Sequence, residues 1–405
     1  MGDERFQAVA ELAVHGANVQ PGQLVLVGAV VGQEQLARCV TAAAYERGAR
    51  YVDVFYFDPW VKRARIESAA EETLDYVPSW LSKRLLEAAA EGAARISFTG
   101  IAAAGALEGL DAARLGRDAL PWLPESMGVM NDRATNWCSI PCPTREWAAA
   151  VHPGLEPDEA YEQLWQELWH VLRLDEPDPV RAWDERVEEL SARARALTEL
   201  RLDALELSGP GTELTLGLLP SSLWLAGDFE TRNGLRHLPN IPSEEVFTAP
   251  DPERVDGHVT STRPLVLKDG TIIRGLRVRF EGGRALAVDA DENAGAIRAR
   301  AAADDGAARL GELALVDAKG RVGPTGTTFL DTLLDENSAS HIALGGAYRF
   351  SVGDDADRDR LNRSAIHIDF MIGSDELEIT GLTREGSRVP IMRGGEWEPG
   401  VLGTV

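Results

Sequence analysis

The stretch Ala365–Ile372 reads Ala-Ile-His-Ile-Asp-Phe-Met-Ile, with isoleucine or phenylalanine at every second position. Strict alternation over eight residues predicts a β-strand with one apolar face, because successive side chains of a strand point to opposite sides. The other face then carries His367 and Asp369, which lie roughly 6.5–7 Å apart along the strand. Neutral imidazole and ionised carboxylate are the usual ligands of zinc and related ions. The stretch therefore predicts a rigid strand that holds two side chains over one divalent metal ion.

A second histidine precedes this strand, in the segment Asp331–Tyr348, and carboxylates lie close to it in sequence. His341 and Tyr348 are seven residues apart, a spacing that would place them on the same face of one helix. Gly345 and Gly346 lie between them, however, and indicate that such a helix ends before the tyrosine. We therefore expect Tyr348 on the loop beyond, and His341 as a further candidate metal ligand.

Two other segments place glutamate where the sequence predicts burial. Asn240–Pro250 contains the adjacent Glu244 and Glu245, and Glu312 lies at the start of the apolar run Leu310–Val316. Burial of an unpaired carboxylate is costly, and metal coordination would compensate for that cost. Taken singly, each glutamate fits a surface or capping role better than a ligand role. Their occurrence together with the two histidines favours a metal site.

Length and composition are those of a folded protein with two domains. The chain has 405 residues, of which 44% are hydrophobic and 26% charged, and its length exceeds that of a typical single domain. No apolar run approaches the 18 residues of a membrane span, so no membrane partner is expected. The first residues lack a basic and apolar signal sequence, and three cysteines do not make a disulfide framework. A cytoplasmic location is the expectation.

The net charge of −24 argues against nucleic acid as a partner, because phosphate binding requires clustered Lys and Arg. We interpret the excess of Asp and Glu as a solvated acidic surface, with adaptation to salt as the alternative.

The first half of the chain alternates between strand and helix patterns. The patterns predict strands at residues 23–28, 51–57 and 94–99, and helices at residues 33–47, 59–69 and 80–91. A β-α-β order predicts a parallel sheet with helices on its faces. The glycines after the first strand lack the spacing of a dinucleotide-binding fingerprint, which favours an ordinary strand-to-helix turn. A long amphipathic helix at residues 180–199 is expected to close this domain.

The second half has the pattern of an α+β domain with a mostly antiparallel sheet that carries the metal site. A hairpin is predicted around Ser208–Gly211, and the turn pairs Asp269-Gly270 and Gly282-Gly283 are typical of further tight hairpins. The strands that these turns join are predicted at residues 258–267, 271–280 and 285–289, and a helix at residues 292–303. We therefore predict an N-terminal α/β domain at residues 1–200 and a C-terminal catalytic domain at residues 201–405.

Four segments together resemble the thermophilic aminopeptidase family of metallopeptidases. They are Asn240–Pro250, Leu310–Leu313, Asp331–Tyr348 and Asn362–Gly373. Their fixed order makes the resemblance specific, and it extends over most of the chain. It implies a two-domain cytoplasmic exopeptidase that forms homodimers and binds two divalent ions (zinc, cobalt or magnesium) in its C-terminal domain.

The resemblance also implies a role for individual residues. The implied metal ligands are Glu245, Glu312, Glu336, His341, His367 and Asp369. Glu312 corresponds to the ligand that bridges the two ions, and Tyr348 to the catalytic tyrosine. Glu244 stays open as an alternative to Glu245, although the match to Glu-Val-Phe-Thr favours Glu245.

Peptide hydrolysis at a free amino end suits this set of residues. Two ions roughly 3.5–4 Å apart can lower the pKa of a shared water and hold the substrate, and an inner carboxylate such as Glu312 can move a proton to the leaving amine. A hydrogen bond from Tyr348 to the oxyanion would contribute about 3–4 kcal/mol. The predicted function is a metal-dependent aminopeptidase acting on peptides. A metallohydrolase of the same architecture acting on a non-peptide amide, and a non-catalytic metal-binding protein, are the alternatives.

Overall fold

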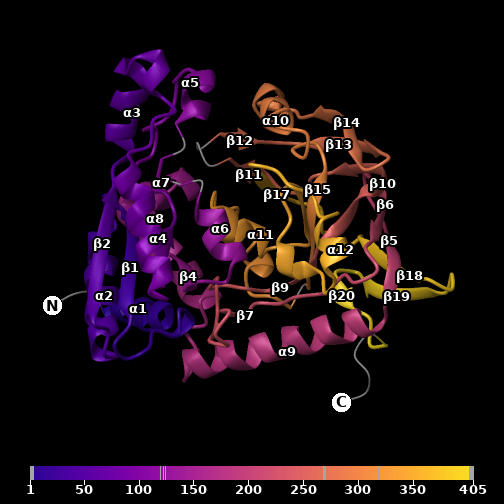
Figure 1. Cartoon of the computed structure of the whole chain (residues 1–405), viewed down its shortest axis with the longest axis horizontal. Coiled ribbons are helices and arrows are strands. Elements are labelled where there is room, and N and C mark those ends of the chain that lie inside the picture. Colours follow the sequence, from indigo (N-terminus) through magenta and orange to yellow (C-terminus); the bar gives the residue numbers. More distant parts are fainter. Residues whose placement is uncertain are drawn as a thin grey trace. The chain divides into compact units, whose positions relative to one another are not determined.

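The computed structural model (Figure 1) describes residues 4–118, 120–121, 123, 125–267, 271–317 and 319–400. The chain separates into two units. One comprises Met1–Asp184 and Asp228–Pro242, and the other comprises Glu185–Gly227 and Ser243–Val405. The division into domains at residues 1–200 and 201–405 stays a prediction. Among the described residues, no helix combines the length and the apolar character needed to cross a membrane.

A sheet of four parallel strands, in the order β2–β1–β3–β4, forms the centre of the first unit. The strands are β1 (Leu24–Val30), β2 (Tyr51–Phe57), β3 (Ala94–Thr99) and β4 (Asn136–Pro141). The described helices of this unit are α1 (Glu4–Gly16), α2 (Glu34–Glu46), α3 (Pro59–Ser68), α4 (Ser79–Ala90), α5 (Ala112–Arg117), α6 (Glu125–Asn131), α7 (Arg145–Val151) and α8 (Pro157–Val171). The predicted parallel sheet with helices is confirmed.

Local sequence explains why these helices form where they do. In α2, the side chains of Leu36, Val40 and Ala44 recur at intervals of four residues and are buried, which gives the helix one apolar stripe. At the start of α3, the carboxylate of Asp58 accepts a hydrogen bond of 2.8 Å from the backbone N–H of Trp60. Such a cap satisfies a donor that has no partner within the helix.

The segment Asp228–Pro242 belongs to the first unit although it follows a long stretch of the second. It contains the short strands β7 (Phe229–Glu230) and β8 (Arg236–His237), which pair with each other. Its end is bonded to β4, because Ser139 donates to the carbonyl of Pro239 and accepts from the N–H of Ile241. The backbone N–H of Leu238 donates to Gly16 at the end of α1.

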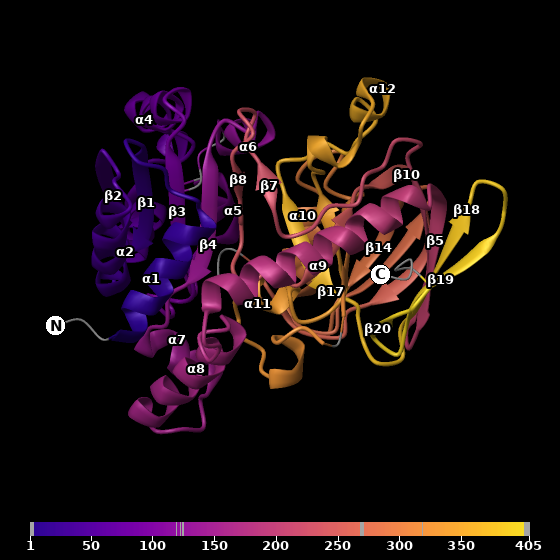
Figure 2. The same cartoon turned by 90° about the horizontal axis from the view of Figure 1, so that it is seen from below.

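The second unit contains an antiparallel sheet of eight strands in the order β14–β13–β10–β6–β5–β18–β19–β20. The strands are β5 (Leu202–Gly209), β6 (Thr212–Leu218), β10 (Pro250–Thr260), β13 (Arg277–Glu281), β14 (Arg284–Asp289), β18 (Glu378–Thr383), β19 (Arg388–Arg393) and β20 (Glu396–Trp397). The predicted hairpin between β5 and β6 is confirmed. The helix α9 (Pro179–Glu199) is long and continuous (Figure 2), and α10 (Ala294–Ala301) is shorter than predicted.

The prediction of single strands at residues 258–267 and 271–280 is wrong. The strand β10 ends at Thr260, and β11 (Leu265–Val266) pairs separately with β12 (Ile272–Ile273). The chain leaves the large sheet because the N–H of Thr262 donates to the carbonyl of Met371, and Pro264 offers no N–H at all. The predicted turn Asp269-Gly270 lies outside the described residues.

A second antiparallel sheet of this unit has four strands in the order β17–β16–β15–β9. They are β9 (Glu245–Thr248), β15 (Leu310–Val316), β16 (His341–Gly345) and β17 (His367–Met371). Buried side chains of this sheet join those of the large sheet and of α9 in one hydrophobic core, including Leu190, Leu216, Leu313, Ile342 and Phe370. The predicted C-terminal unit with a largely antiparallel sheet is thus confirmed.

His341 lies on a strand and not on a helix. The helix α11 (Thr332–Glu336) ends five residues earlier, and the side chain of Asn337 donates to the carbonyl of Leu333 at its end. Ser340 and Val316 then bond across the neighbouring strands before β16 begins. A helix that carries His341 is therefore excluded. Tyr348 lies on a loop, as expected, but this loop follows a strand and not the end of a helix, and it leads into a single 3₁₀ turn at Arg349–Ser351.

Candidate metal centre

One face of the four-stranded sheet is polar, and alternation along each strand explains why. In β15, the side chains of Leu313 and Leu315 belong to the hydrophobic core, so Glu312 points to the opposite face. In β17, Ile368 packs against that core and Phe370 belongs to it, whereas Asp369 points away from it. The same rule places His341, Glu245 and His367 on the polar face.

The register between strands brings these polar residues together from four distant parts of the chain. Glu312 lies opposite Ala343, which in turn lies opposite Asp369. His341 lies opposite Ala314 in β15. Alanine therefore occupies the positions between the larger side chains, and its single methyl group leaves space above the sheet for their functional groups.

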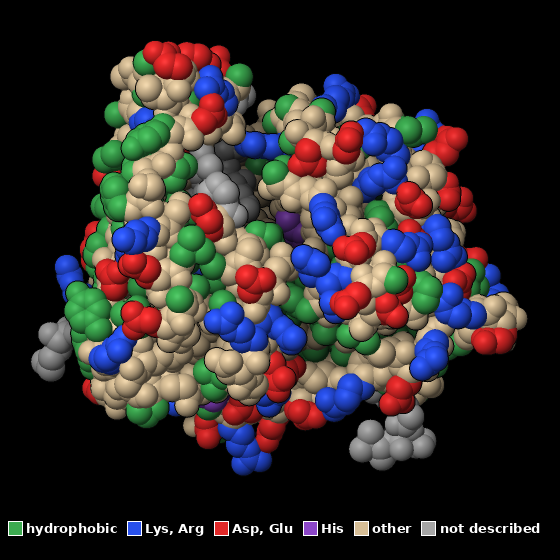
Figure 3. Space-filling view, viewed as in Figure 1, with side chains coloured by type: hydrophobic (Ala, Val, Ile, Leu, Met, Phe, Trp, Pro, Cys, Tyr) green, Lys and Arg blue, Asp and Glu red, His purple; other side chains and the backbone are tan. Residues whose placement is uncertain are grey.

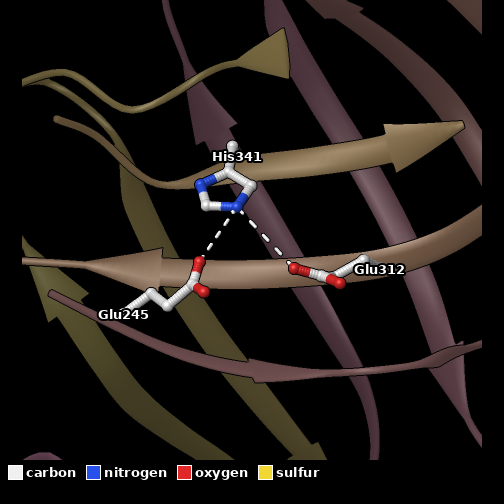
Figure 4. A group of neighbouring side chains, drawn as sticks. All are labelled: Glu245, Glu312 and His341. Carbon is white, nitrogen blue, oxygen red and sulfur yellow. Dashed lines mark ion pairs between the residues drawn. The ribbon is translucent and has the colours of Figure 1, made fainter. Parts of the chain in front are cut away.

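Glu245, Glu312 and His341 form the first group of neighbouring side chains (Figure 4). The Nε2 atom of His341 lies 3.1 Å from Oε2 of Glu245 and 3.7 Å from Oε1 of Glu312. On the other side of the ring, Nδ1 lies 3.2 Å from the carbonyl oxygen of Ala339 and donates to it. This bond fixes the ring so that Nε2 faces the two carboxylates, an arrangement common in metal-binding histidines.

Glu312, His367 and Asp369 form the second group. The Nε2 atom of His367 lies 3.5 Å from Oε2 of Glu312 and 3.2 Å from Oδ1 of Asp369. Its Nδ1 donates to the carbonyl of Gly346 at 2.8 Å. Glu312 thus belongs to both groups, and each of its two oxygens faces a different histidine.

Glu336 belongs to neither group of close ligand atoms, but a carboxylate from each group affects its pKa. It is the last residue of α11, whose first turn is capped by Asp331. Burial raises the pKa of Glu336 well above its usual range, and the charges of Asp369 and Glu245 raise it further. A carboxylate at this place therefore lies close to the other acidic side chains of the site.

Tyr348 lies beside the second group. The centre of its ring is 5.9 Å from that of His367 and 6.1 Å from that of Phe247. Burial raises the pKa of Tyr348 well above its usual value, and four nearby carboxylates, Glu312 foremost, raise it further. The phenol consequently keeps its proton at neutral pH and can donate a hydrogen bond.

The electrostatics of the site favour a bound cation. Burial raises the pKa of Glu312 above its usual range, and the charges of Glu245 and Asp369 add to the shift. Burial lowers the pKa of a histidine, but Asp369 and Glu312 outweigh that effect and raise the pKa of His367 to about 10. Crowded carboxylates with two imidazoles are the donors that divalent ions such as zinc prefer. The residues fit such ions.

Glu244 points away from this site. Its carboxylate lies on the opposite side of the strand end, where Oε2 is 2.7 Å from Nε of Arg186. Between the two adjacent glutamates, the geometry thus favours Glu245 as the ligand. Two nearby residues were not found from the sequence: Ala343, whose small size carries no chemical signal, and Arg186, which looks like any charged residue of an amphipathic helix.

The thermophilic metalloprotease (M29) family matches residues 2–397 of the chain. The chain belongs to this family. As an M29 protein it is a metallo-aminopeptidase, a hydrolase whose family implies divalent metal ions.

Named aminopeptidases match nearly the whole chain in sequence. Aminopeptidase T of Thermus aquaticus is 41% identical over 97% of this chain and 98% of its own length. Aminopeptidase PepS of Streptococcus thermophilus is 36% identical over the same shares. The solved structure of wild-type AmpT from Thermus thermophilus has a TM-score of 0.89 and 39% identity, and the match covers 97% of this chain and 99% of that one.

Proposed function

We propose that this M29 aminopeptidase binds two divalent ions, zinc, cobalt or magnesium, on the polar face of the four-stranded sheet. The observation that carries the proposal is the position of Glu312, whose two oxygens face His341 and His367 respectively. A carboxylate shared between two groups of ligands suits a pair of ions. Glu245 and His341 would complete one site, and His367 and Asp369 the other.

Glu336 would supply the sixth protein ligand, because its charge interacts with both Asp369 and Glu245. Mixed imidazole and carboxylate ligands accept zinc, cobalt or magnesium. When bound, such ions lower the pKa of a coordinated water and polarise the carbonyl of the substrate.

Two side chains would take part in the reaction itself. Tyr348, which keeps its proton, would donate a hydrogen bond from its hydroxyl to the oxygen of the scissile carbonyl as negative charge develops there. Glu312, the carboxylate shared by the two groups, would move the proton of the attacking water to the leaving amine. The substrate would be a peptide with a free amino end.

The family resemblance also supports proposals on assembly, location and domains. We propose that the protein is a homodimer in the cytoplasm. Its α/β domain would comprise residues 1–200, and its catalytic domain residues 201–405.

The proposed site is tested by Glu312→Gln and His341→Ala. Each change should lower the release of p-nitroaniline from an amino-acid p-nitroanilide by at least about 100-fold, because it removes a ligand from the proposed pair of ions. Metal content is measured in parallel by elemental analysis, and thermal unfolding should stay cooperative.

Glu213→Gln is the matched control, since Glu213 is exposed on β6 and lies outside both groups. Its activity and metal content should equal those of the unaltered protein. Hydrolysis by either site variant in a rigorously metal-free sample would refute the proposal.

A further inference from the structure

A buried ion-pair network lies behind the metal centre, on the opposite side of the strand ends. Arg186 and Arg193 reach into it from α9, and both side chains are only 7% exposed. Their partners include Glu244 and Asp317, whose side chains are 0% and 1% exposed. Charges buried to this degree require paired geometry, because an unpaired one is strongly destabilising.

The register of β9 and β15 explains why a cation is needed there. Glu245 lies opposite Val316, so one position further along the same antiparallel register Glu244 faces Asp317. Two like charges directly opposite on neighbouring strands repel each other. Without a cation between them, this repulsion would separate the strand ends next to Glu245.

Arg186 contacts both of these carboxylates. Its Nε lies 2.7 Å from Oε2 of Glu244, and its Nη2 lies 3.2 Å from Oδ1 of Asp317. A guanidinium carries its donors in a rigid planar fork, so it fixes the distance between two acceptors as well as neutralising them. The backbone N–H of Glu244 is also held, by a bond of 2.6 Å to the side chain of Asn337.

Glu245 is the first residue of its strand, so the position of its backbone depends on how the preceding residue, Glu244, is held. We propose that Arg186 is a positioning residue for the metal centre. By joining Glu244 to Asp317, it holds the start of β9 so that the Glu245 carboxylate stays within reach of His341. This inference rests on the proposed role of Glu245 as a ligand.

Arg193 provides a matched comparison within the same network. It lies on the same helix and is equally buried, and its Nη1 is 3.2 Å from Oδ2 of Asp317. Within the part of the chain that the structure describes, its ion pairs are to Asp317 and Glu189, not to Glu244. Loss of Arg193 therefore disturbs the network without releasing the residue next to Glu245.

The test compares Arg186→Met with Arg193→Met in the full-length chain. Zinc chloride is titrated into each metal-free protein by calorimetry, and thermal unfolding of the same samples measures stability without metal. We expect Arg186→Met to bind one of the ions about tenfold more weakly, an effect in the range for residues that orient metal ligands. Arg193→Met should lower the unfolding temperature but keep its zinc affinity within about twofold. Equal zinc affinities in the two variants would overturn the proposal.

Arg186→Lys serves if the methionine variant does not fold. Lysine keeps the charge but is a point donor, so it does not fix the distance between two carboxylates as a guanidinium does. Its zinc affinity should fall by roughly threefold or more, and an unchanged affinity would overturn the proposal. Glu245→Gln separates the ligand role of Glu245 from the positioning role of Arg186. If that variant keeps both ions, the ligand assignment is wrong. If it loses one while Arg186→Met and Arg186→Lys keep both, only the positioning role is wrong.

Discussion

The surroundings of Tyr348 determine the protonation state of its hydroxyl. Burial and four neighbouring carboxylates hold its pKa well above the usual value. A phenol in that state is a hydrogen-bond donor and is a poor base or anionic ligand at neutral pH. Its contribution to catalysis should therefore be confined to stabilising charge on the substrate.

Replacement of Tyr348 by phenylalanine should lower kcat by about 100- to 1000-fold, the usual cost of losing one oxyanion donor. Metal content should not change, because the hydroxyl is not among the proposed ligands. Steady-state kinetics and elemental analysis on the same preparation check both statements. Tyr76→Phe, at a residue that is 64% exposed, is the control. Loss of metal from the Tyr348 variant would instead identify the tyrosine as a ligand.

His237 is a buried histidine of the first unit and is not among the proposed ligands. Its ring packs against Trp137, with ring centres 4.6 Å apart, and against Phe229 at 6.3 Å. Burial lowers its pKa from 6.5 to about 4. The neutral imidazole is therefore the form that the folded state favours.

This shift predicts a loss of stability in acid. Between pH 6.5 and pH 4 the unfolded chain binds a proton at His237 that the folded chain does not, so the free energy of unfolding falls as pH falls. The full effect is roughly 3 kcal/mol, since one pKa unit corresponds to about 1.4 kcal/mol. Denaturant unfolding at several pH values should show this loss, and His237→Phe should remove it. A similar change in slope for His258→Asn, at an exposed histidine, would contradict the assignment.

At the scale of elements, the strand β16 separates the proposed ligands of its two neighbours. Ala343 lies between Glu312 and Asp369 in the register and is completely buried. The side chain at this position must be small, because the functional groups on both sides meet above it.

Ala343→Leu should therefore abolish metal binding, since the larger side chain would occupy that space. Overpacking of this kind costs about 1–3 kcal/mol, so the variant should still fold. Ala343→Gly keeps the space open and should retain its ions. Elemental analysis after dialysis, with circular dichroism to confirm folding, distinguishes them. Full metal content in the leucine variant would show that the ions do not lie above this strand.

The local sequence pattern was sufficient to predict some helices and strands but not others. The strand β2 has the predicted bounds, Tyr51–Phe57, and β17 (His367–Met371) lies within the predicted strand Ala365–Ile372. His341 was harder to place, because the short apolar run that follows it fits a buried strand or a helix equally well. The break after Thr260 depends on a bond from Thr262 to Met371, a partner 109 residues away that no local pattern reveals.

The candidate site likewise depends on contacts that the local sequence pattern does not reveal. Alternation alone suggested that His367 and Asp369 share a face, and their Nε2 and Oδ1 atoms lie 3.2 Å apart. Alternation also requires Glu244 and Glu245 to face opposite sides, but it does not tell which side faces the other ligands. That answer comes from Arg186, which lies on another element and pairs with Glu244.

At the scale of the whole molecule, the acidic excess is spread among basic groups. The chain has 65 acidic and 41 basic residues, and the face in Figure 3 shows Asp and Glu side chains interspersed with Lys and Arg. Exposed ion pairs of this kind contribute little to stability. Removal of positive charge should lower stability mainly at the crowded carboxylates of the candidate metal centre.

Chelation of the metal should therefore loosen one part of the molecule selectively. Without ions, repulsion among the buried carboxylates favours opening of β9, β15, β16 and β17, so their amide hydrogens should exchange faster. The strands β1–β4 of the first unit carry none of the proposed ligands and should keep their protection. Hydrogen exchange measured by mass spectrometry with and without chelator tests this contrast. A uniform increase across both units would contradict it.

The segment Asp228–Pro242 belongs to the first unit, and this limits how the two units can be expressed separately. A gene fragment that begins at residue 201 would encode this segment without Gly16 and Ser139, its backbone hydrogen-bond partners. Leu238 and Ile241, which are 5% and 0% exposed, would become accessible to solvent and form an apolar patch prone to aggregation. A stand-alone catalytic module would thus need this segment excised and a short designed linker from Gly227 to Ser243.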